Sequence, residues 1–554
     1  METKNNHLDF YIIDAIGPFF KKQKRTVNWS KIPFFALDKK GEIKAKRIEK
    51  ILKRFRRFVS KCSELGYNAI SLDDLAHLVT FDFYPARLQK KLSIYKSLYS
   101  KLFDLAIKEG LYIYINTDIM FFNQAISDYT RNRESNIIAL LSKALEQLFC
   151  NYPVKGVVFR IGENDGIDVK GDFISRLSIK TPRQANRYLK QLLPIFEMRD
   201  KFLIFRTWTV GIHKIGDLMF NPVTFAKTFS QIESEHLIVS MKYGDTDFFD
   251  QLDLNPLIMN CPHKFILELQ TRREREGFGE LPYYVGWQYE RYFRQLAGTI
   301  NFTGISVWCQ TGGWSKWQNL TFIKRSSPWN ELNTTAAIEI FKNGSSADSV
   351  LHALYNKQIT DFITLCHETF TNIIYIKNLS VMTLYLRRLR LPPLLWIYWD
   401  HVIINPLVMA LYNFVGHQEF SVPRDELKKI KKMGKKLNIS NIDFIYDTLL
   451  ILAKCHRAIT QKYINTKLIH EIAKYEKKYP NGLVFSVRTS QQNFGYTRTL
   501  FKLFLRKQAK YRPLDYVLLS PPASYLIRLL VKSLTKHMPG FVNKQAMPIE
   551  ELFK

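Results

Sequence analysis

Between about residue 25 and residue 325, short runs of β-branched and aromatic residues alternate with longer stretches whose apolar residues recur every three or four positions. The short runs are typical of buried strands, and the longer period is typical of amphipathic helices. Strands that alternate with helices predict βα units around a parallel sheet. Eight strand-like runs occur, at 27–34, 67–70, 111–115, 156–161, 202–207, 237–241, 264–269 and 304–308.

Eight such runs predict an α/β fold, a (β/α)8 TIM barrel over residues 27–328, preceded by an N-terminal extension at 1–26. Helices are expected between the strands, for instance at 44–66, 133–149 and 181–198. In this fold the carboxyl ends of the strands form the catalytic face. We therefore expect the functional residues directly after the strand-like runs.

After residue 328 the helical period dominates, with lysine-rich stretches and one further strand-like run at 482–487. We predict a basic, mostly α-helical C-terminal domain at 329–554. Its segment 499–537 contains two basic amphipathic stretches, which can lie on an anionic membrane or pack against the barrel. The most apolar window, 391–415, contains Asp400, His401 and three prolines, which favours a buried or interfacial element over a membrane span.

The composition adds a charge imbalance to this picture. The chain has 554 residues, 46% of them hydrophobic, which excludes a disordered or fibrous protein. It carries 81 Lys and Arg against 50 Asp and Glu, a formal charge of +31 that splits into +15 before residue 331 and +16 after it. Such an excess points to an anionic partner, and nucleic acid, acidic lipid and acidic glycan all fit.

The cysteines and the N-terminus bear on the compartment. The six cysteines lie far apart, without a spacing that would chelate zinc, so we interpret them as reduced thiols. The first 25 residues have no basic region ahead of an apolar stretch and no small-residue cleavage site. We expect a cytoplasmic protein, peripheral on the cytoplasmic membrane face if the C-terminal helices bind lipid.

Polar and aromatic residues cluster where the last five predicted strands end. Carboxylates on several strands, with tryptophans between them, are what glycoside hydrolysis needs, because one acid protonates the leaving oxygen, one base activates water and flat rings hold sugars. The sequence contains no glycine-rich phosphate loop, serine nucleophile elbow or HExxH motif, and we expect neither a metal nor another cofactor. The candidate residues are Arg160, Glu163, Arg206, Trp208, Lys242, Tyr243, Asp247, Glu268, Gln270, Trp308, Gln310 and Trp314.

The passage between the sixth and seventh runs resembles the family-67 glycoside hydrolases, the α-glucuronidases, which keep a K…DF…PL…EFQ order. The matching residues here are Lys242, Asp247, Phe248, Asn255, Pro256, Leu257, Glu268, Leu269 and Gln270. The resemblance implies a barrel enzyme that removes an α-linked uronic sugar from a glycan with inversion.

The resemblance also implies roles for individual residues. Glu163 would be the general acid, and Asp247 and Glu268 would activate water. Arg206 and Lys242 would hold the carboxylate of the substrate. Arg160 lies one position from where the family would place another cationic ligand. Their positions at the predicted strand ends, and not the resemblance, assign Trp208, Tyr243, Trp308, Gln310 and Trp314 to the substrate-binding site, together with Gln270.

Other interpretations stay open. The protein can be a non-hydrolytic glycan-binding or sugar-transferring factor in surface-polysaccharide assembly, and Trp308 and Trp314 can serve barrel packing alone. Nucleic-acid binding agrees with the charge but lacks a recognition motif in the sequence.

Overall fold

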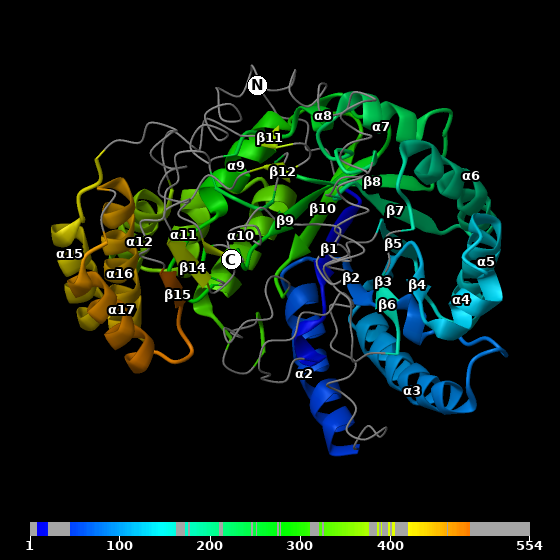
Figure 1. Cartoon of the computed structure of the whole chain (residues 1–554), viewed down its shortest axis with the longest axis horizontal. Coiled ribbons are helices and arrows are strands. Elements are labelled where there is room, and N and C mark those ends of the chain that lie inside the picture. The colour runs from blue at the N-terminus through cyan, green and yellow to red at the C-terminus, as the bar shows by residue number, and fades with distance from the viewer. Residues whose placement is uncertain are drawn as a thin grey trace.

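The structure is a computed structural model of the whole chain. It describes residues 8–19, 45–161, 172–175, 178–209, 214–244, 247–250, 252–273, 276–277, 279–310, 321–323, 326–375, 385–386, 389–390, 397–398, 401–404, 419–461 and 464–487. Within these ranges eight parallel strands form a closed barrel in the order β1-β10-β9-β8-β7-β5-β3-β2 (Figure 1). The predicted TIM barrel is therefore confirmed.

The strands match the sequence pattern except at the start of the chain. They are β1 (Phe10–Asp14), β2 (Ala69–Asp73), β3 (Tyr112–Asp118), β5 (Gly156–Arg160), β7 (Phe202–Arg206), β8 (Leu237–Lys242), β9 (Phe265–Gln270) and β10 (Phe302–Trp308).

The prediction was wrong about the first strand, because β1 lies inside the segment that we assigned to an N-terminal extension. All five residues of β1 are buried, and β1 pairs with β2 on one side and β10 on the other. The strand thereby closes the barrel. The predicted run at 27–34 lies outside the described residues.

Helices surround the barrel, as the sequence predicted. They are α2 (Ala45–Glu64), α3 (Ala86–Lys108), α5 (Glu134–Asn151), α6 (Pro182–Met198), α7 (Pro222–Phe229), α8 (Pro256–Met259), α9 (Gly286–Gln295) and α10 (Pro328–Asn343), with a short α4 (Gln124–Thr130) and a two-stranded ribbon of β4 (Phe121–Phe122) and β6 (Ile174–Ser175).

Local sequence fixes several of the helix starts. The side chain of Thr181 accepts a hydrogen bond from the Gln184 amide at the start of α6, and Ser327 does the same with Asn330 at the start of α10. Proline follows each cap at the first helical position, where its missing N–H costs nothing.

The lower interior of the barrel is an apolar plug, made of Phe10, Ile12, Ala69, Tyr114, Val158, Ile204, Ile238 and Ile266. Two glycines permit a close approach of neighbouring strands here. A Cβ at Gly156 would lie 2.2 Å from the carbonyl oxygen of Phe202 and 2.9 Å from the ring of Tyr114, and a Cβ at Gly304 would lie 2.1 Å from the carbonyl oxygen of Phe10. Because the plug fills the lower barrel, a ligand can enter only from the carboxyl ends of the strands, which we call the barrel mouth.

Helix α10, which begins at the domain boundary that we predicted, packs against the barrel. The hydroxyl of Tyr67, just before β2, donates to the Thr334 carbonyl of α10 at 2.8 Å. The hydroxyls of Thr271, just after β9, and Thr334 lie 2.9 Å apart. The helix therefore covers the seam where the barrel closes.

The chain beyond α10 is mostly helical, as predicted, and packs beside the barrel (Figure 1). Its elements are α11 (Ala347–Leu354), α12 (Lys357–Ile374), α15 (Arg424–Lys436), α16 (Ile442–Thr460) and α17 (Thr466–Lys478), with short strands β11 (Tyr385–Leu386), β12 (Leu389–Arg390), β13 (Ile397–Tyr398), β14 (His401–Ile404) and β15 (Val484–Val487). One hydrophobic core runs through both parts, from Leu8 to Phe485.

Part of the apolar window at 391–415 is described. It contains β13 and β14, and β14 pairs in parallel with β15, with Val402 and Ile404 fully buried. This agrees with the prediction of a buried element. In the described part of the chain, no helix is both long and apolar enough to cross a membrane. The basic segment 499–537 lies outside the described residues.

Candidate active site

The inner wall of the barrel changes from apolar to polar as the strands approach the mouth. Side chains alternate between the two faces of a strand, so residues two positions beyond the apolar plug still face inward. On β7, β8 and β9 the plug residues Ile204, Ile238 and Ile266 thus share the inner face with the residues two positions further along. These are Arg206, Ser240 and Glu268. The buried polar set on this wall is Asp14, Ser71, Asp73, Asn116, Asp118, Arg160, Arg206, Ser240, Lys242, Glu268, Gln270 and Ser306.

Arg206 and Glu268 are joined across the intervening strand β8. The Nε of Arg206 donates to Oε1 of Glu268 at 2.8 Å, and its Nη2 donates to Oε2 at 2.7 Å. The hydroxyl of Ser240 donates to Oε1 at 2.7 Å, and the indole N–H of Trp308 donates to Oε2 at 3.3 Å. Glu268 thus accepts four hydrogen bonds, which is about the full capacity of a carboxylate.

These contacts decide the charge of Glu268. Complete burial opposes its ionisation, but the positive charge of Arg206 and the hydrogen bonds from Arg206 and Ser240 outweigh burial, and its pKa is lowered. The guanidinium carbon of Arg206 also lies 4.6 Å from the ring centroid of Trp308. Glu268 is therefore an ionised, fully engaged carboxylate that fixes Arg206 against an indole.

Lys242 and Asp247 form the second ion pair of this wall. The Nζ of Lys242 lies 2.7 Å from Oδ1 of Asp247, which also accepts from the amide of Phe248 at 3.0 Å. The same Nζ lies 3.2 Å from the ring centroid of Trp208 and 4.4 Å from that of Phe248. The side chain of Asp247 is 11% exposed, so it is more accessible than Glu268.

The opposite wall, from β2 to β5, is built around Arg160. Its Nε donates to Oδ1 of Asp118 at 2.9 Å, and its Nη1 donates to Oδ2 of Asp73 at 3.2 Å. Asn116 on β3 is the register partner of Asp73 on β2, and Asp118 is the partner of Arg160 on β5. These side chains therefore share one patch of the mouth.

Two neighbouring carboxyls have strongly raised pKa values. Burial raises the pKa of Asp14 to about 6, although the backbone amides of Cys309 and Gln310 donate to it. Burial also raises the pKa of Asp74 to about 7, where Asp73 and Asp118 add repulsion and Arg160 opposes the rise. The mouth thus combines an ionised carboxylate on β9 with carboxyls near β1 and β2 that hold protons close to neutral pH.

The structure places the remaining predicted residues at several locations. Tyr243 faces away from the mouth, where its hydroxyl donates to the Phe249 carbonyl at 3.0 Å and accepts from Arg273. The amide of Gln310 is held at both ends by the backbone of Thr321. Gln270 is buried at the end of β9, beside Trp308 in register.

Glu163 and Trp314 lie outside the described residues. The structure therefore brings together Arg160, Arg206, Trp208, Lys242, Asp247, Glu268 and Trp308 at the mouth, with Gln270 at its edge.

Polar residues on β1, β2 and β3, most of them acidic, belong to the mouth but were not among the predicted site residues. Each of these strands ends in aspartate, as FYIID, AISLD and YINTD. An aspartate that closes an apolar run was a readable signal once a barrel was expected, because strand ends form its catalytic face. The missed residues are Asp14, Asp73, Asp74, Asn116 and Asp118.

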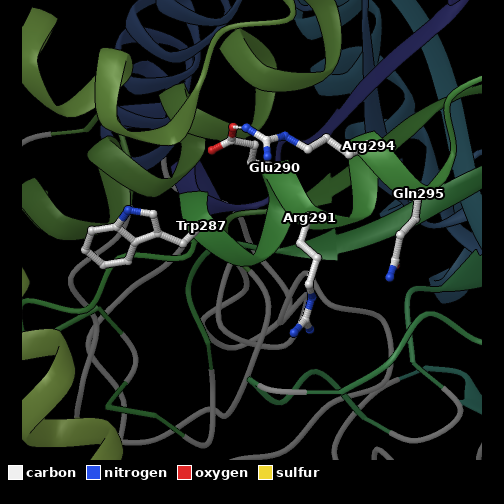
Figure 2. A pocket seen from close by; sticks show the side chains of 5 residues that line it. All are labelled: Trp287, Glu290, Arg291, Arg294 and Gln295. Carbon is white, nitrogen blue, oxygen red and sulfur yellow. Dashed lines mark hydrogen bonds and ion pairs between the residues drawn. The ribbon is translucent and has the colours of Figure 1, made fainter.

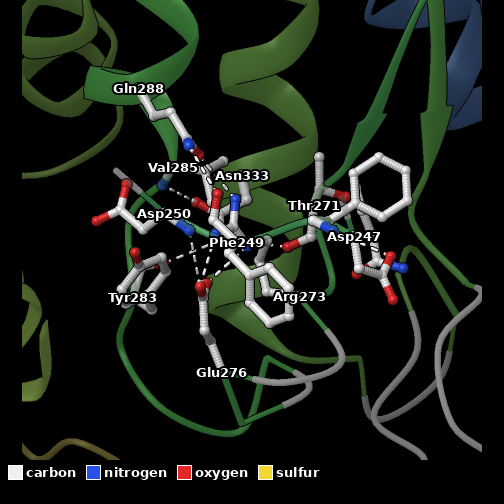
Figure 3. Close-up of polar contacts among 12 residues, drawn as sticks. Asp247, Phe249, Asp250, Thr271, Arg273, Glu276, Tyr283, Val285, Gln288 and Asn333 are labelled. Carbon is white, nitrogen blue, oxygen red and sulfur yellow. Dashed lines mark hydrogen bonds and ion pairs between the residues drawn. The ribbon is translucent and has the colours of Figure 1, made fainter. Parts of the chain in front are cut away.

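A second buried network lies behind β8 and β9 (Figure 3). Arg273 donates to Oε1 of Glu276 at 2.7 Å and to the side chains of Gln288 and Tyr243 at 2.8 Å. The Asp250 amide donates to Glu276 and to the hydroxyl of Tyr375 at the end of α12. All of these groups are paired with one another, which indicates that the network fastens α12 to the barrel.

A pocket of about 350 Å³ is lined by five residues of α9 and by none of the polar residues of the mouth (Figure 2). Its charged side chains are already occupied, since Arg294 pairs with Glu290 and Arg291 donates to the Leu252 carbonyl. The indole of Trp287 donates to Asp348 at 2.8 Å. Within the described ranges, no three His, Cys, Asp or Glu side chains are grouped so that they could hold a metal ion. The mouth is therefore the strongest candidate site.

Comparisons with known proteins give distant likenesses only. No family model and no curated protein matches the sequence. Among solved structures, a GH138 enzyme targeting pectin rhamnogalacturonan II is 11% identical with a TM-score of 0.46, over 86% of this chain and 59% of that one.

CpGH84B is 12% identical with a TM-score of 0.39, over 86% of this chain and 73% of that one. A D-allulose 3-epimerase from Methylomonas sp. is 11% identical with a TM-score of 0.33, over 61% of this chain and 98% of that one. The chain thus spans 59% of the first of these structures, and likeness at this level fixes no common activity.

Proposed function

We propose that the protein is a glycoside hydrolase whose active site is the barrel mouth, and that it removes an α-linked uronic sugar from a glycan with inversion. The observation that carries the proposal is the wall from β7 to β10, where two carboxylates, two cations and two indoles converge. Carboxylates supply the acid–base chemistry of glycoside hydrolysis, and indole faces stack on sugar rings.

The contacts divide the roles of the two carboxylates. Glu268 has both oxygens fully engaged, so we assign it to holding Arg206 in place. The side chain of Asp247 is 11% exposed and pairs with Lys242 through one oxygen, and we assign it to the base that activates water. Glu163, three residues beyond β5, is the proposed general acid, on the resemblance to the α-glucuronidases.

The cations suit a substrate carboxylate. Arg206 donates to Glu268 through Nε and through one hydrogen of Nη2. Among the described residues its Nη1 group donates to none of the mouth carboxylates, so it can donate to a substrate. Lys242 adds a point charge above Trp208. A planar fork and a point charge together can orient a uronic acid over the indole.

Hydrolysis of oligosaccharides that carry α-linked glucuronic acid tests this function. We expect Asp247→Asn to lower kcat/KM by at least about 100-fold, because general acid–base catalysis contributes that much or more. Asp253→Asn is the matched control, since it makes the same change at an exposed position on the same connection and should leave kcat/KM within about twofold.

The stereochemistry of the product separates the mechanisms. An inverting enzyme releases the β-anomer first, which NMR of the fresh product detects. Full activity in both Asp247→Asn and Glu163→Gln would refute the proposal. Oligosaccharides that bind without being cleaved would favour the glycan-binding or transferring interpretation instead.

We also propose that the protein acts in the cytoplasm and docks to an anionic membrane face through its basic C-terminal part, in which the sequence assigns residues 499–537 to the contact. Helix α15 buries Leu427 and Ile430 and exposes Lys428, Lys432 and Lys435. Flotation of the full chain with phosphatidylserine vesicles should weaken as salt rises. No association at low salt would refute the docking.

A further inference from the structure

Two buried polar groups on the β2–β5 side of the mouth have no hydrogen-bond partner among the described residues. Asn116 is 1% exposed, and neither the oxygen nor the nitrogen of its side-chain amide has a hydrogen-bond partner in the described part of the chain. The Nη2 of Arg160, a residue that is 3% exposed, likewise has no partner within the described ranges. Proteins rarely leave such groups unsatisfied unless a ligand or water completes them.

Both groups face the mouth. Asn116 lies two residues beyond Tyr114, whose ring is part of the apolar plug, so the two side chains point to the same interior. Arg160 likewise lies two residues beyond Val158, which is also part of the apolar plug, so its side chain points to the interior too. Asp73 is the register partner of Asn116 on the adjacent strand.

Taken together, the side chains of this wall have the mixed hydrogen-bonding capacity that hydroxyl groups require. Asn116 can donate and accept at once, Arg160 Nη2 can only donate, and the carboxylate oxygens of Asp73 and Asp118, which pair with Arg160, can accept. A hydroxyl group both donates and accepts, so adjacent hydroxyls of a sugar ring can satisfy all of them.

We propose that Asp73, Asn116, Asp118 and Arg160 form a subsite for the hydroxyl groups of the substrate sugar. The inference rests on the proposed function and deepens it, because it names how the uncharged part of the sugar is recognised. Asp73 and Asp118 already compensate Arg160 and would repel an anion. The carboxylate of a uronic sugar is therefore directed to Lys242 on the opposite wall.

Binding of two glycosides that differ only at C6 tests the subsite. The probes are methyl α-D-glucuronoside and methyl α-D-glucoside, titrated calorimetrically against the full chain. We expect the nearly isosteric Asn116→Leu to weaken both about tenfold, the loss expected for a hydrogen-bonded hydroxyl. Lys242→Met should weaken the glucuronoside and leave the glucoside unchanged.

A stability measurement without ligand gives a second readout. Because Asn116→Leu removes two unsatisfied polar atoms from a buried position, its Tm should equal that of the wild type or exceed it by roughly 1–3 °C. Asn116→Ala keeps the binding test available if leucine does not fit. Thr117→Val is the matched control, because the next residue of β3 faces away from the mouth and donates to a backbone carbonyl.

Three results would overturn the subsite. They are unchanged affinity for both glycosides in the Asn116 variants, an equal loss of affinity in Thr117→Val, and no binding of either glycoside to the wild type at tens of millimolar. The hydrolysis assay keeps the two proposals apart. Cleavage that depends on Asp247 with no role for Asn116 refutes the subsite alone, and binding through Asn116 with no glycan cleaved refutes the hydrolase alone.

Discussion

Arg206 and Glu268 hold each other through two parallel hydrogen bonds of 2.8 and 2.7 Å, across the intervening strand β8. Their side chains are 7% and 0% exposed. A residue proposed to bind substrate and a residue expected from the sequence to activate water are thus bound to each other. The pair therefore sets the position of the free guanidinium edge at the mouth.

Removing one partner of this ion pair should cost much more than removing both. Glu268→Gln leaves Arg206 buried without a counter-charge, and we expect the free energy of unfolding to fall by about 3–5 kcal/mol. The double variant Arg206→Met and Glu268→Met should recover most of that loss, because two apolar side chains need no counter-charge. Urea denaturation of the three proteins measures both effects. A loss in Glu268→Gln as small as that of a surface substitution would contradict the buried pair.

Asp14 should make stability depend on pH. Burial raises its pKa to about 6, whereas an aspartate in the unfolded chain titrates near 4. Between about pH 4 and pH 6 the folded protein keeps a proton that the unfolded chain has lost. The stabilisation from this proton is fully present below pH 4 and is lost as the pH rises through 6.

The variant Asp14→Asn isolates this contribution, since it keeps an oxygen that can accept from the amides of Cys309 and Gln310. Relative to the wild type, the variant should gain on the order of 2–3 kcal/mol of stability between pH 4 and pH 7. Denaturation at several pH values measures the difference. Parallel profiles for the two proteins would show that the pKa of Asp14 is not raised.

Tyr375 should couple α12 to the barrel. Its hydroxyl contacts Glu276 and accepts from the Asp250 amide at 2.7 Å. We expect Tyr375→Phe to lower the free energy of unfolding by about 1–2 kcal/mol and to speed hydrogen exchange in α12. Tyr129→Phe, at a half-exposed position, is the control and should change neither quantity. Unchanged exchange in α12 would mean that other contacts hold the helix.

Thiol labelling checks the burial of the cysteines. Cys150 is exposed and the other five are buried, with the pKa of Cys261 raised by burial to about 11. Because the thiolate is the reactive form, one thiol should react quickly with Ellman's reagent in the native protein and all six after denaturation. Cys150→Ser should abolish the fast phase. Several fast thiols in the native protein would contradict the packing of the core.

The sequence determined the architecture. The alternation of strand-like and helix-like runs was enough to predict the barrel, and every predicted strand from residue 67 onward has a counterpart in the structure. The first strand was missed because FYIID stands ahead of the regular series of runs, which begins near residue 25. Only closure of the barrel places FYIID between β2 and β10.

The tertiary structure alone decided which side chains meet. Period-two alternation placed Arg206, Lys242 and Glu268 at strand ends, but their pairing depends on strand order and register, which join residues far apart in the chain. The same register leaves Asn116 and Arg160 on the opposite wall with polar atoms that no described residue hydrogen-bonds. Hydrophobic periodicity depends only on neighbouring residues in the chain. Which polar side chains meet depends on strand order and register, and these are set only when the sheet closes into a barrel.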